Sequence, residues 1–316
     1  MARPVKGRLR RGLERLAARC VAAVTAAVMP LIPLRWCRAA GNLAGYLLYA
    51  VSLRRQRLAD ANLVAVFGGR YSPHERRAIR LRVAKNMTTL FAELFKLRTF
   101  TRRQILEVMP SEGADHMRKA LARGKGALLI SAHYGNWEAA GARLAAEGFS
   151  VAVVARDASD TQVASLINSS RAGAELRVIG KDDALGMIRH LRANGVLAIL
   201  PDQHSNEDPI RVSFLGRPAW CARGPAMLAL RTGCAVVPGF GFRNPDGSLR
   251  GYCLEEIPLP QTSDREAAVA ELMQRIYDVI GEQIMAHPEQ WLWFHNRWKE
   301  YTPATSEVEP ADAPEG

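Results

Sequence analysis

The chain has 316 residues, of which 48% are hydrophobic and 23% are charged, so it is long enough for one large domain and too apolar for general disorder. Its formal net charge of +12 is concentrated at one end, because residues 1–57 hold twelve Lys and Arg but one acid, and the remainder is nearly neutral. A nucleic-acid enzyme would spread basic residues over its binding face, so this distribution disfavours nucleic acid and favours attachment to a membrane surface.

Two apolar stretches lie among these basic residues, at positions 20–34 and 39–53. A span needs about 20 apolar residues, whereas Pro30 and Pro33 interrupt the first stretch and basic clusters flank the whole segment on both sides. We therefore expect residues 1–57 to lie in, or dip into, an interface rich in anionic inner-leaflet lipids. A buried core helix with a solvated basic arm is the alternative, and a cleaved signal peptide fits less well.

The pattern over residues 59–96 is helical, with a break at 67–73 where Ser72 or Pro73 begins the next helix. We interpret residues 58 to about 125 as a helical collar that leads into the core. From Gly126 onward, short apolar runs alternate with helical patterns of roughly ten residues, which predicts an α/β fold with a largely parallel, mixed sheet flanked by helices. The expected strands are 127–130, 151–155, 176–179, 196–200 and 235–240, and the expected helices follow Asn136, begin at Thr161, and cover 182–193 and 225–232.

The end of the chain predicts a closing strand at 249–257, paired through a hairpin at 244–247 with the strand before it, and then a long amphipathic helix. Trp291, Trp293 and Trp298 follow within eight residues, and we interpret them as a packed aromatic plug or an interface anchor rather than a catalytic device. The acidic, Pro-rich and Ala-rich tail at 302–316 is predicted to be disordered. The main folded domain is therefore predicted to cover residues 58–301, between the attachment segment and the tail.

His133 and Glu138 stand five residues apart where a predicted strand gives way to a helix that Asn136 can cap. Ligands of parallel sheets gather at the carboxyl ends of the strands, and the helix dipole favours an ionised Glu138 in the first helical turn. We expect Glu138 to orient the His133 imidazole, so that His133 acts as a general base on a hydroxyl that arrives with the substrate. Ser131 lacks a Gly-x-Ser-x-Gly elbow, so a covalent intermediate on it is disfavoured.

Other polar residues follow the predicted strands or lie in loops near them. Arg156 and Arg171 carry guanidinium groups that suit phosphate or a developing oxyanion, with a solvated helix face as the alternative for each. The substrate-binding candidates at this edge are completed by Asn136, Asp202, Gln203 and Arg217.

Metal and cofactor chemistry are not expected from the residues. One His and one Glu are too few for a metal site, no second His stands at helical spacing, and Gly239-Phe-Gly241 lacks the third glycine of a dinucleotide fingerprint. The five cysteines form an odd number without a Cys-x-x-Cys pair, which is typical of reduced thiols and not of a disulfide framework or a zinc site.

Several segments in order resemble the lipid A late acyltransferases, the lauroyl/myristoyl transferase branch of the wider lysophospholipid/glycerolipid acyltransferase superfamily. The wider superfamily carries His-x4-Asp, whereas the lipid A branch has the His-x4-Glu found here. The resemblance runs from about residue 62 to residue 299 and also rests on the segments Asp202-Gln203, 214–218, 232–238 and 287–299.

This resemblance implies a membrane O-acyltransferase at the bacterial inner membrane, with its catalytic domain facing the cytoplasm. His133, oriented by Glu138, would remove a proton from a sugar hydroxyl of a lipid A precursor or related glycolipid, which would attack an acyl thioester on acyl carrier protein or coenzyme A. Arg171, and less directly Arg156, would stabilise the oxyanion or hold a substrate phosphate. A basic surface would suit both the acidic carrier and the anionic lipid.

The segment between Arg156 and Arg171 begins Asp-Ala-Ser-Asp-Thr-Gln, where many lipid A enzymes carry Asn-Pro. We therefore expect the acceptor pocket to differ from the pocket of those enzymes. Another glycolipid, a lysophospholipid or a lipid-linked amine is an alternative acceptor. A non-catalytic lipid-binding protein of the same fold and a thioester hydrolase are the competing functions.

Overall fold

The computed structural model describes residues 16, 19–21, 23–155 and 161–300. The expected disordered tail at 302–316 and the candidate Arg156 lie outside the described residues.

A seven-stranded mixed sheet forms the centre of the molecule, in the order β1-β9-β8-β2-β5-β3-β4. The five strands from β8 to β4 are parallel, whereas β9 pairs antiparallel with β8 and β1 pairs with β9 at the edge. The predicted α/β class, with a largely parallel sheet and a closing hairpin, is confirmed. The strands are β1 Ser111–Glu112, β2 Ala127–Ile130, β3 Val151–Ala155, β4 Arg177–Gly180, β5 Val196–Ile199, β8 Ala235–Arg243 and β9 Leu249–Cys253.

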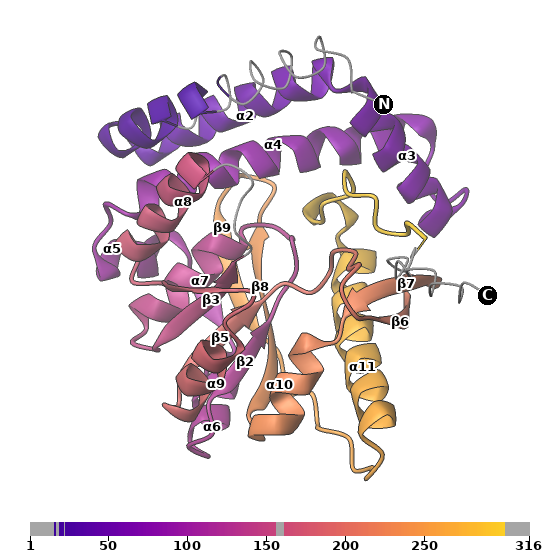
Figure 1. The fold of residues 1–316 in the computed structure, drawn as a ribbon. Helices are drawn as coiled ribbons and strands as arrows, with labels where there is room; N and C mark the ends of the chain where they lie inside the picture. The colour runs from indigo at the N-terminus through magenta and orange to yellow at the C-terminus, as the bar shows by residue number, and fades with distance from the viewer. Residues whose placement is uncertain (1–15, 17–18, 22, 156–160, 301–316) are drawn as a thin grey trace, which may run out of the picture.

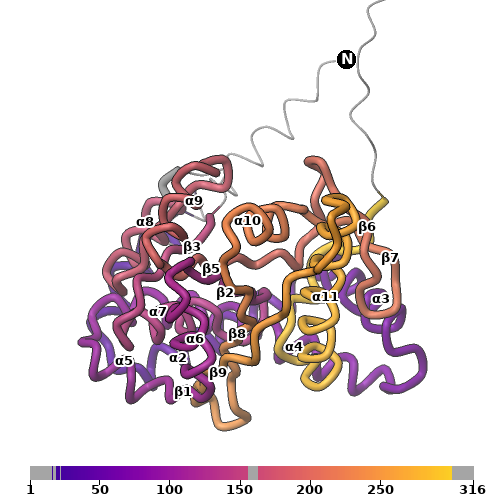
Figure 2. The backbone as a smooth tube through the Cα atoms, turned by 90° about the horizontal axis from the view of Figure 1, so that it is seen from below, coloured from indigo at the N-terminus to yellow at the C-terminus, as the bar shows by residue number. Residues whose placement is uncertain are grey.

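Helices cover both faces of this sheet, because crossover connections between parallel strands place them there. Figure 2 shows α6 (Ala114–Leu121) and α7 (Trp137–Ala146) on one side of the strands and α10 (Gly224–Thr232) and α11 (Arg265–Ala286) on the other. The pleat alternates along each strand, so Leu129 packs toward α7 while Leu128 and Ile130 pack toward α10 and α11. The remaining core helices are α5 Arg102–Val108, α8 Thr161–Gly173 and α9 Ala184–Arg192.

A layer of helices lies across the end of the sheet at which the parallel strands finish, and it joins the first part of the predicted collar (residues 58 to about 125) to residues of the predicted attachment segment (Figure 1). It consists of a short 3-10 turn η1 (Met29–Leu31), α2 (Leu34–Val51), α3 (Leu53–Phe67) and α4 (Pro73–Leu97). As expected, Ser72 caps α4, and Ser72 and Glu75 form a reciprocal capping box.

Helix α2 packs against α4 at very short range through Gly41 and Gly45, where a Cβ on either glycine would lie 2.6 Å from a backbone Cα of α4. Within the described residues, no helix is both long enough and apolar enough to cross a bilayer. Attachment of residues 1–57 to a membrane therefore stays a prediction.

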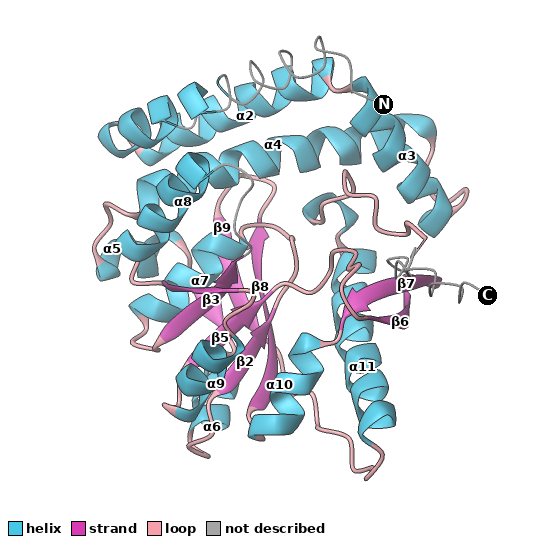
Figure 3. Ribbon diagram, in the orientation of Figure 1, coloured by secondary structure: helices cyan, strands magenta, loops and turns pink. Residues whose placement is uncertain are grey.

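A separate two-stranded hairpin, β6 (Pro209–Phe214) and β7 (Arg217–Ala222), lies beside α11 (Figure 3). Neither strand is among those expected from the sequence. Its turn uses positive φ at Leu215 (53°) and Gly216 (74°), a geometry that joins adjacent antiparallel strands. Because the first turn residue is leucine and not glycine or asparagine, the sequence does not show the usual pattern of a two-residue hairpin turn.

The C-terminal tryptophans form the predicted aromatic plug next to this hairpin, after a short 3-10 turn η2 (Pro288–Gln290). Trp291 packs edge-on against Phe214 and Trp293, and Trp298 stacks on Phe214. The plug thereby ties the end of the chain to the core.

Candidate active site at the carboxyl edge of the sheet

The turn that carries His133 is held on both sides by backbone hydrogen bonds. Gly135 donates to the carbonyl of Gln290 at 2.9 Å, and Leu292 donates to the carbonyl of His133 at 3.1 Å. Gly135 has φ of 55°, and a Cβ there would lie 1.7 Å from the carbonyl oxygen of Gly241, so the position accepts only glycine. His133 is therefore presented by a fixed backbone.

Asp202 is the carboxylate that contacts His133. Its Oδ1 lies 2.9 Å from Nδ1 of the imidazole, and its Oδ2 accepts the backbone N–H of His133 at 3.0 Å. The indole N–H of Trp291 donates to the same Oδ2 at 2.8 Å. Burial raises the pKa of the Asp202 carboxyl, but the charge and hydrogen bonds of His133 and the Trp291 indole outweigh it, so this pKa lies below its usual value.

The strand register explains why these two residues meet. Ile130 of β2 pairs with Ile199 of its parallel neighbour β5, and three residues beyond each partner the chain reaches His133 and Asp202. An ionised carboxylate only accepts hydrogen bonds, so in the neutral imidazole of His133 the proton lies on Nδ1 and Nε2 keeps its lone pair. The amide nitrogen of Gln203 lies 3.3 Å from this Nε2. The imidazole is 23% exposed, so a substrate hydroxyl can reach it in place of that amide.

Glu138 has a different partner from the one the sequence analysis expected. Arg171 of α8 holds it in a bidentate ion pair, with Nε donating to Oε2 at 3.0 Å and the second nitrogen donating to Oε1 at 2.6 Å. The Trp137 indole also donates to Oε1 at 3.2 Å, and no hydrogen bond joins Glu138 to His133 in the described structure. The expectation that Glu138 orients the imidazole by contact is corrected: the first turn of α7 directs this side chain toward α8.

Arg171 lines the same cleft as His133, but three of its N–H donors are already engaged, two by Glu138 and one by the side chain of Asn168 at 3.2 Å. The pair is therefore an electrically balanced bridge between α7 and α8 rather than a free guanidinium. It still presents N–H groups at the cleft wall, because the Arg171 side chain is partly exposed.

Two other candidates lie away from the cleft. Asn136 is fully buried, and its amide oxygen accepts the backbone N–H of Ala139 as the predicted cap of α7. Arg217 begins β7, with its guanidinium carbon 5.5 Å from the Trp298 ring centroid, and it is not among the residues that line the cleft. The structure thus gives Asn136 a structural partner and Arg217 an aromatic one, and it brings neither to the imidazole.

A cleft of about 530 Å³ opens beside His133, within the roughly 300–1,000 Å³ range of ligand sites. It extends over both faces of the sheet edge, because Leu129 and Ala198 line it from the α7 face while Ile199 lines it from the other. The branch on the α7 face is apolar and is bounded by Leu129, Ala140, Gly141, Val153, Leu176 and Ala198. At its rim lies Ser131, whose buried hydroxyl has no hydrogen-bond partner among the described residues.

Two site residues escaped the sequence analysis. Trp291, assigned there only to packing, holds Asp202 in place. His295 accepts the backbone N–H of His204 at 3.2 Å, and burial, aided by the charge of Arg297 and opposed by Asp202, lowers the pKa of His295 to about 4. Both belong to the segment 287–299 that contributed to the family resemblance, but nothing in their spacing indicates a contact with a residue some ninety positions earlier.

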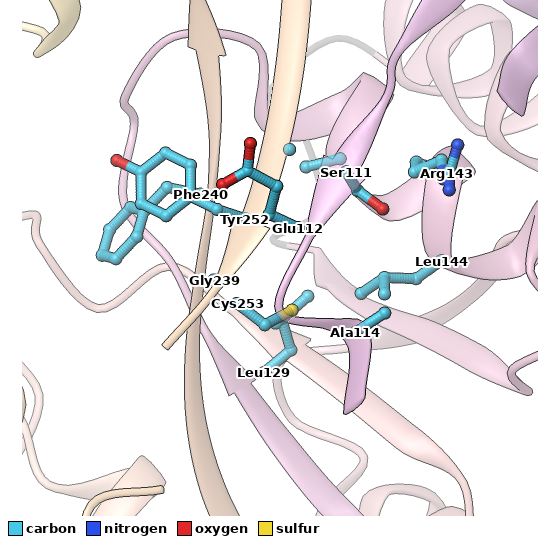
Figure 4. A pocket seen from close by; sticks show the side chains of 12 residues that line it. Ser111, Glu112, Ala114, Leu129, Arg143, Leu144, Gly239, Phe240, Tyr252 and Cys253 are labelled. Carbon is cyan, nitrogen blue, oxygen red and sulfur yellow. The ribbon is translucent and has the colours of Figure 1, made fainter. Parts of the chain in front are cut away.

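A second, much smaller space of about 20 Å³ lies between β1, β8, β9 and α7 (Figure 4). Its walls include Leu144 and Cys253, and burial raises the pKa of the Cys253 thiol to about 11. A buried thiol with a raised pKa packs as a small apolar group. No cluster of three or more His, Cys, Asp or Glu residues is arranged to hold a metal ion in the described part of the chain.

A family model described as bacterial lipid A biosynthesis acyltransferase matches residues 10–300. The chain belongs to this family. The family's description is that of an acyltransferase, and the predicted resemblance is confirmed over a longer stretch than the one its motifs covered.

Curated relatives agree with this assignment. A phosphatidylinositol mannoside acyltransferase of Mycobacterium tuberculosis is 27% identical over 213 residues, which are 65% of this chain and 66% of the relative, so the chain spans just under two thirds of that protein's length. The lipid A biosynthesis lauroyltransferase of Escherichia coli K12 is 27% identical over 254 residues, covering 78% of this chain and 79% of the relative. The lipid A biosynthesis palmitoleoyltransferase of the same organism is 23% identical over 252 residues, with 78% and 79% covered.

Proposed function

We propose that the protein transfers a fatty acyl chain from an acyl thioester to a hydroxyl of a membrane glycolipid, with His133 as the general base and Asp202 as the residue that orients it. The observation that carries this proposal is the Asp202 contact with Nδ1, which leaves Nε2 of His133 facing the cleft with its lone pair available. This dyad replaces the His133–Glu138 dyad suggested by the sequence.

In the proposed step, Nε2 of His133 takes the proton of the acceptor hydroxyl while the oxygen attacks the thioester carbonyl. The tetrahedral oxyanion then collapses, the C–S bond breaks, and the imidazolium returns its proton to the departing thiolate. The products are an ester and a free thiol, and the enzyme regains its starting protonation state. A positioned base of this kind contributes about 10² to 10⁴ in rate, so the walls of the cleft must supply the remainder.

Two groups of the cleft are suited to stabilise the oxyanion. The Ser131 hydroxyl is buried, lines the cleft and is unpartnered among the described side chains, so a substrate carbonyl would satisfy a group that is otherwise costly to bury. Arg171, fixed by Glu138, presents N–H donors at the same wall. We assign Glu138 to holding Arg171 in position, so it acts through that residue.

The apolar branch beneath α7 is the proposed site of the acyl chain. The residues that bound this branch, Leu129, Ala140, Gly141, Val153, Leu176 and Ala198, are all apolar. The branch on the opposite face is lined at its rim by the polar residues Lys181, His204 and Ser205. We assign this branch to the acceptor head group. An acyl chain and a polar head group would then meet at His133.

The acceptor is proposed to be a lipid A precursor or a related glycolipid, since the printed names of the relatives include both lipid A and phosphatidylinositol mannoside. A lysophospholipid or another membrane lipid is the alternative. Acyl carrier protein is the proposed donor, with coenzyme A as the competing carrier.

Helix α2 supports the proposed location at a membrane surface. Its inner face packs on α4, while its outer face exposes large apolar side chains: Trp36, Leu43, Tyr46, Leu47, Leu48 and Val51. Monomeric soluble proteins seldom expose so many large apolar groups together, and basic residues adjoin them in residues 1–57. We propose that α2 lies in the lipid interface and that the catalytic core sits on the cytoplasmic side of an inner membrane.

The test is acyl transfer from acyl carrier protein and from coenzyme A to lipid A precursors, other glycolipids and lysophospholipids, with wild type and His133→Ala. We expect ester formation by wild type and a loss of about 10² to 10⁴ in kcat for the variant, provided that it remains folded. Full activity of a folded His133→Ala protein would refute the mechanism. Vesicle binding without any transfer would favour a lipid-binding protein, and free fatty acid at saturating acceptor would favour a hydrolase.

A further inference from the structure

Glu93 is a buried acid that receives hydrogen bonds from three other segments. It belongs to α4 and is 1% exposed. Arg38 of α2 donates to its Oε1 at 2.7 Å, and Arg243 of β8 donates to both oxygens at 3.0 and 2.6 Å. The amide nitrogen of Asn136 donates to Oε2 at 2.6 Å. An isolated carboxylate is costly to bury, so this one persists because every contact around it is a donor.

One arm of this cluster reaches the catalytic turn. The Nδ2 group of Asn136 binds Glu93, which fixes the direction of its Oδ1, and that oxygen caps α7 through the N–H of Ala139 at 2.9 Å. The backbone N–H of Asn136 also donates to Gly241 at 2.9 Å. Asn136 lies between His133 on the turn and Glu138 in the first turn of α7. Glu93 therefore fixes the position of Asn136, the residue that lies between His133 and Glu138.

The other arm reaches α2. Arg38 is next to Cys37, and Cys37, Gly41, Gly45 and Tyr49 form the face of α2 that is buried against α4. The opposite face of the same helix exposes its large apolar side chains. A single carboxylate thus bonds to the proposed lipid-facing helix and to the cap of the helix that carries Glu138.

We propose that Glu93 is a positioning residue for the catalytic turn, and that Arg38 makes the position of this turn depend on how α2 is seated on α4. This inference rests on the proposed function for its kinetic readout but not for its structural one. When α2 is displaced, Glu93 loses one of its partners and the Asn136 cap relaxes. A lipid surface that holds α2 in place would then favour the productive geometry at His133.

The experiment compares Arg38→Gln with Arg35→Gln. Both arginines lie in α2 within one turn, and both changes remove one positive charge. Arg35 is exposed and packs over the ring of Trp36 at 5.8 Å, whereas Arg38 alone of the two contacts Glu93. Glu93→Gln is less suitable because it leaves two guanidinium groups without their carboxylate. Asn136→Ser serves as a second variant, since it keeps an N-cap acceptor but removes the amide that reaches Glu93.

For Arg38→Gln and Asn136→Ser we expect kcat to fall by about 10- to 100-fold with the donor KM little changed, while Arg35→Gln stays near wild type. Hydrogen exchange of the backbone amides in residues 133–140 should become faster in the first two variants only. Vesicle co-sedimentation should be the same for the two arginine variants.

Equal kcat and equal exchange in Arg38→Gln and Arg35→Gln would overturn the inference, as would a lower melting temperature with unchanged kcat and unchanged exchange at 133–140. If wild type transfers no acyl group to any acceptor, the proposed function fails, but the exchange comparison still decides whether Glu93 positions the turn.

Discussion

Asp202 accepts hydrogen bonds from both the imidazole ring and the backbone N–H of His133, at 2.9 and 3.0 Å. Two contacts from one carboxylate fix the ring proton on Nδ1 and also fix the ring relative to its own backbone. Glu138, five residues from His133 in the sequence, makes neither contact, because it is engaged by Arg171.

This relationship separates the roles of the two acids. Asp202→Asn should lower kcat by about 10² to 10⁴, because an amide in place of the carboxylate no longer holds the imidazole in the productive tautomer. Glu138→Gln should cause a smaller loss, since it only frees Arg171. Steady-state kinetics of both folded variants decide the order, and a greater loss in Glu138→Gln would restore the dyad first expected from the sequence.

The pH dependence of stability should report on His295. Its pKa is lowered to about 4 by burial, from an ordinary value of 6.5. Between these two values the unfolded chain binds a proton that the folded protein does not, so the free energy of unfolding should decrease as the pH falls through this window. Urea denaturation of wild type and His295→Gln at about pH 7 and about pH 5 tests it.

The glutamine variant keeps an acceptor for the His204 N–H but cannot titrate. We expect its loss of stability between the two pH values to be smaller than that of wild type. An identical loss in both proteins would show that another group controls this range.

The length of the acyl chain should depend on Gly141. A Cβ at this position would lie 3.4 and 3.6 Å from the two terminal carbons of Leu176, so larger side chains would fill the apolar branch of the cleft. Gly141→Val is expected to shift the preference toward shorter acyl donors, because each buried methylene contributes about 0.8 kcal/mol. Competition between donors of different length, analysed by mass spectrometry of the products, measures the shift. An unchanged profile with unchanged kcat would place the acyl chain elsewhere.

Ser131→Ala should affect activity but not stability. The hydroxyl has no partner among the described residues, so its removal leaves nothing unsatisfied and the melting temperature should stay the same or rise slightly. If the hydroxyl donates to the reacting carbonyl, kcat should fall by about 10²-fold, as for other single oxyanion donors. A stable variant with wild-type kcat would remove Ser131 from the proposed mechanism.

Membrane binding should depend on the outer face of α2. The double change Leu43→Gln and Leu47→Gln alters two side chains that are 61% and 56% exposed, so the fold should be retained while co-sedimentation with anionic vesicles decreases. Leu185→Gln, on α9 and 66% exposed, is the matched control and should bind as wild type does. Equal binding by both proteins would mean that α2 is not the attachment surface. Deletion of residues 1–57 is a poorer test, because it also removes Arg38 and uncovers α4.

Most of the core elements could be predicted because their signals are local. The strand at 127–130 and the cap at Asn136 follow from a short apolar run and from a side chain that satisfies the nearest backbone donors. The hairpin of β6 and β7 was not predicted because its first turn residue is Leu215. A turn with positive φ is normally indicated by Gly, Asn or Asp at this position.

The candidate site was predictable in location but not in pairing. Strand ends placed His133 and Asp202 at the same edge of the sheet, and the structure confirms that they meet. Two features decide which carboxylate contacts the imidazole: the register of β2 against β5, and the direction in which α7 projects Glu138. Neither feature can be predicted from the residue spacing within one segment.

The sequence by itself determined the class of fold, the position of the turn that carries His133 and the concentration of charge at one end, because periodicity, capping and composition act over a few residues. The tertiary structure decided the partners: Asp202 for His133, Trp291 for Asp202, Arg171 for Glu138, and Glu93 for Asn136. These contacts join residues 33 to 89 positions apart, and only packing of the sheet, the helices and the C-terminal plug brings such groups within hydrogen-bond distance.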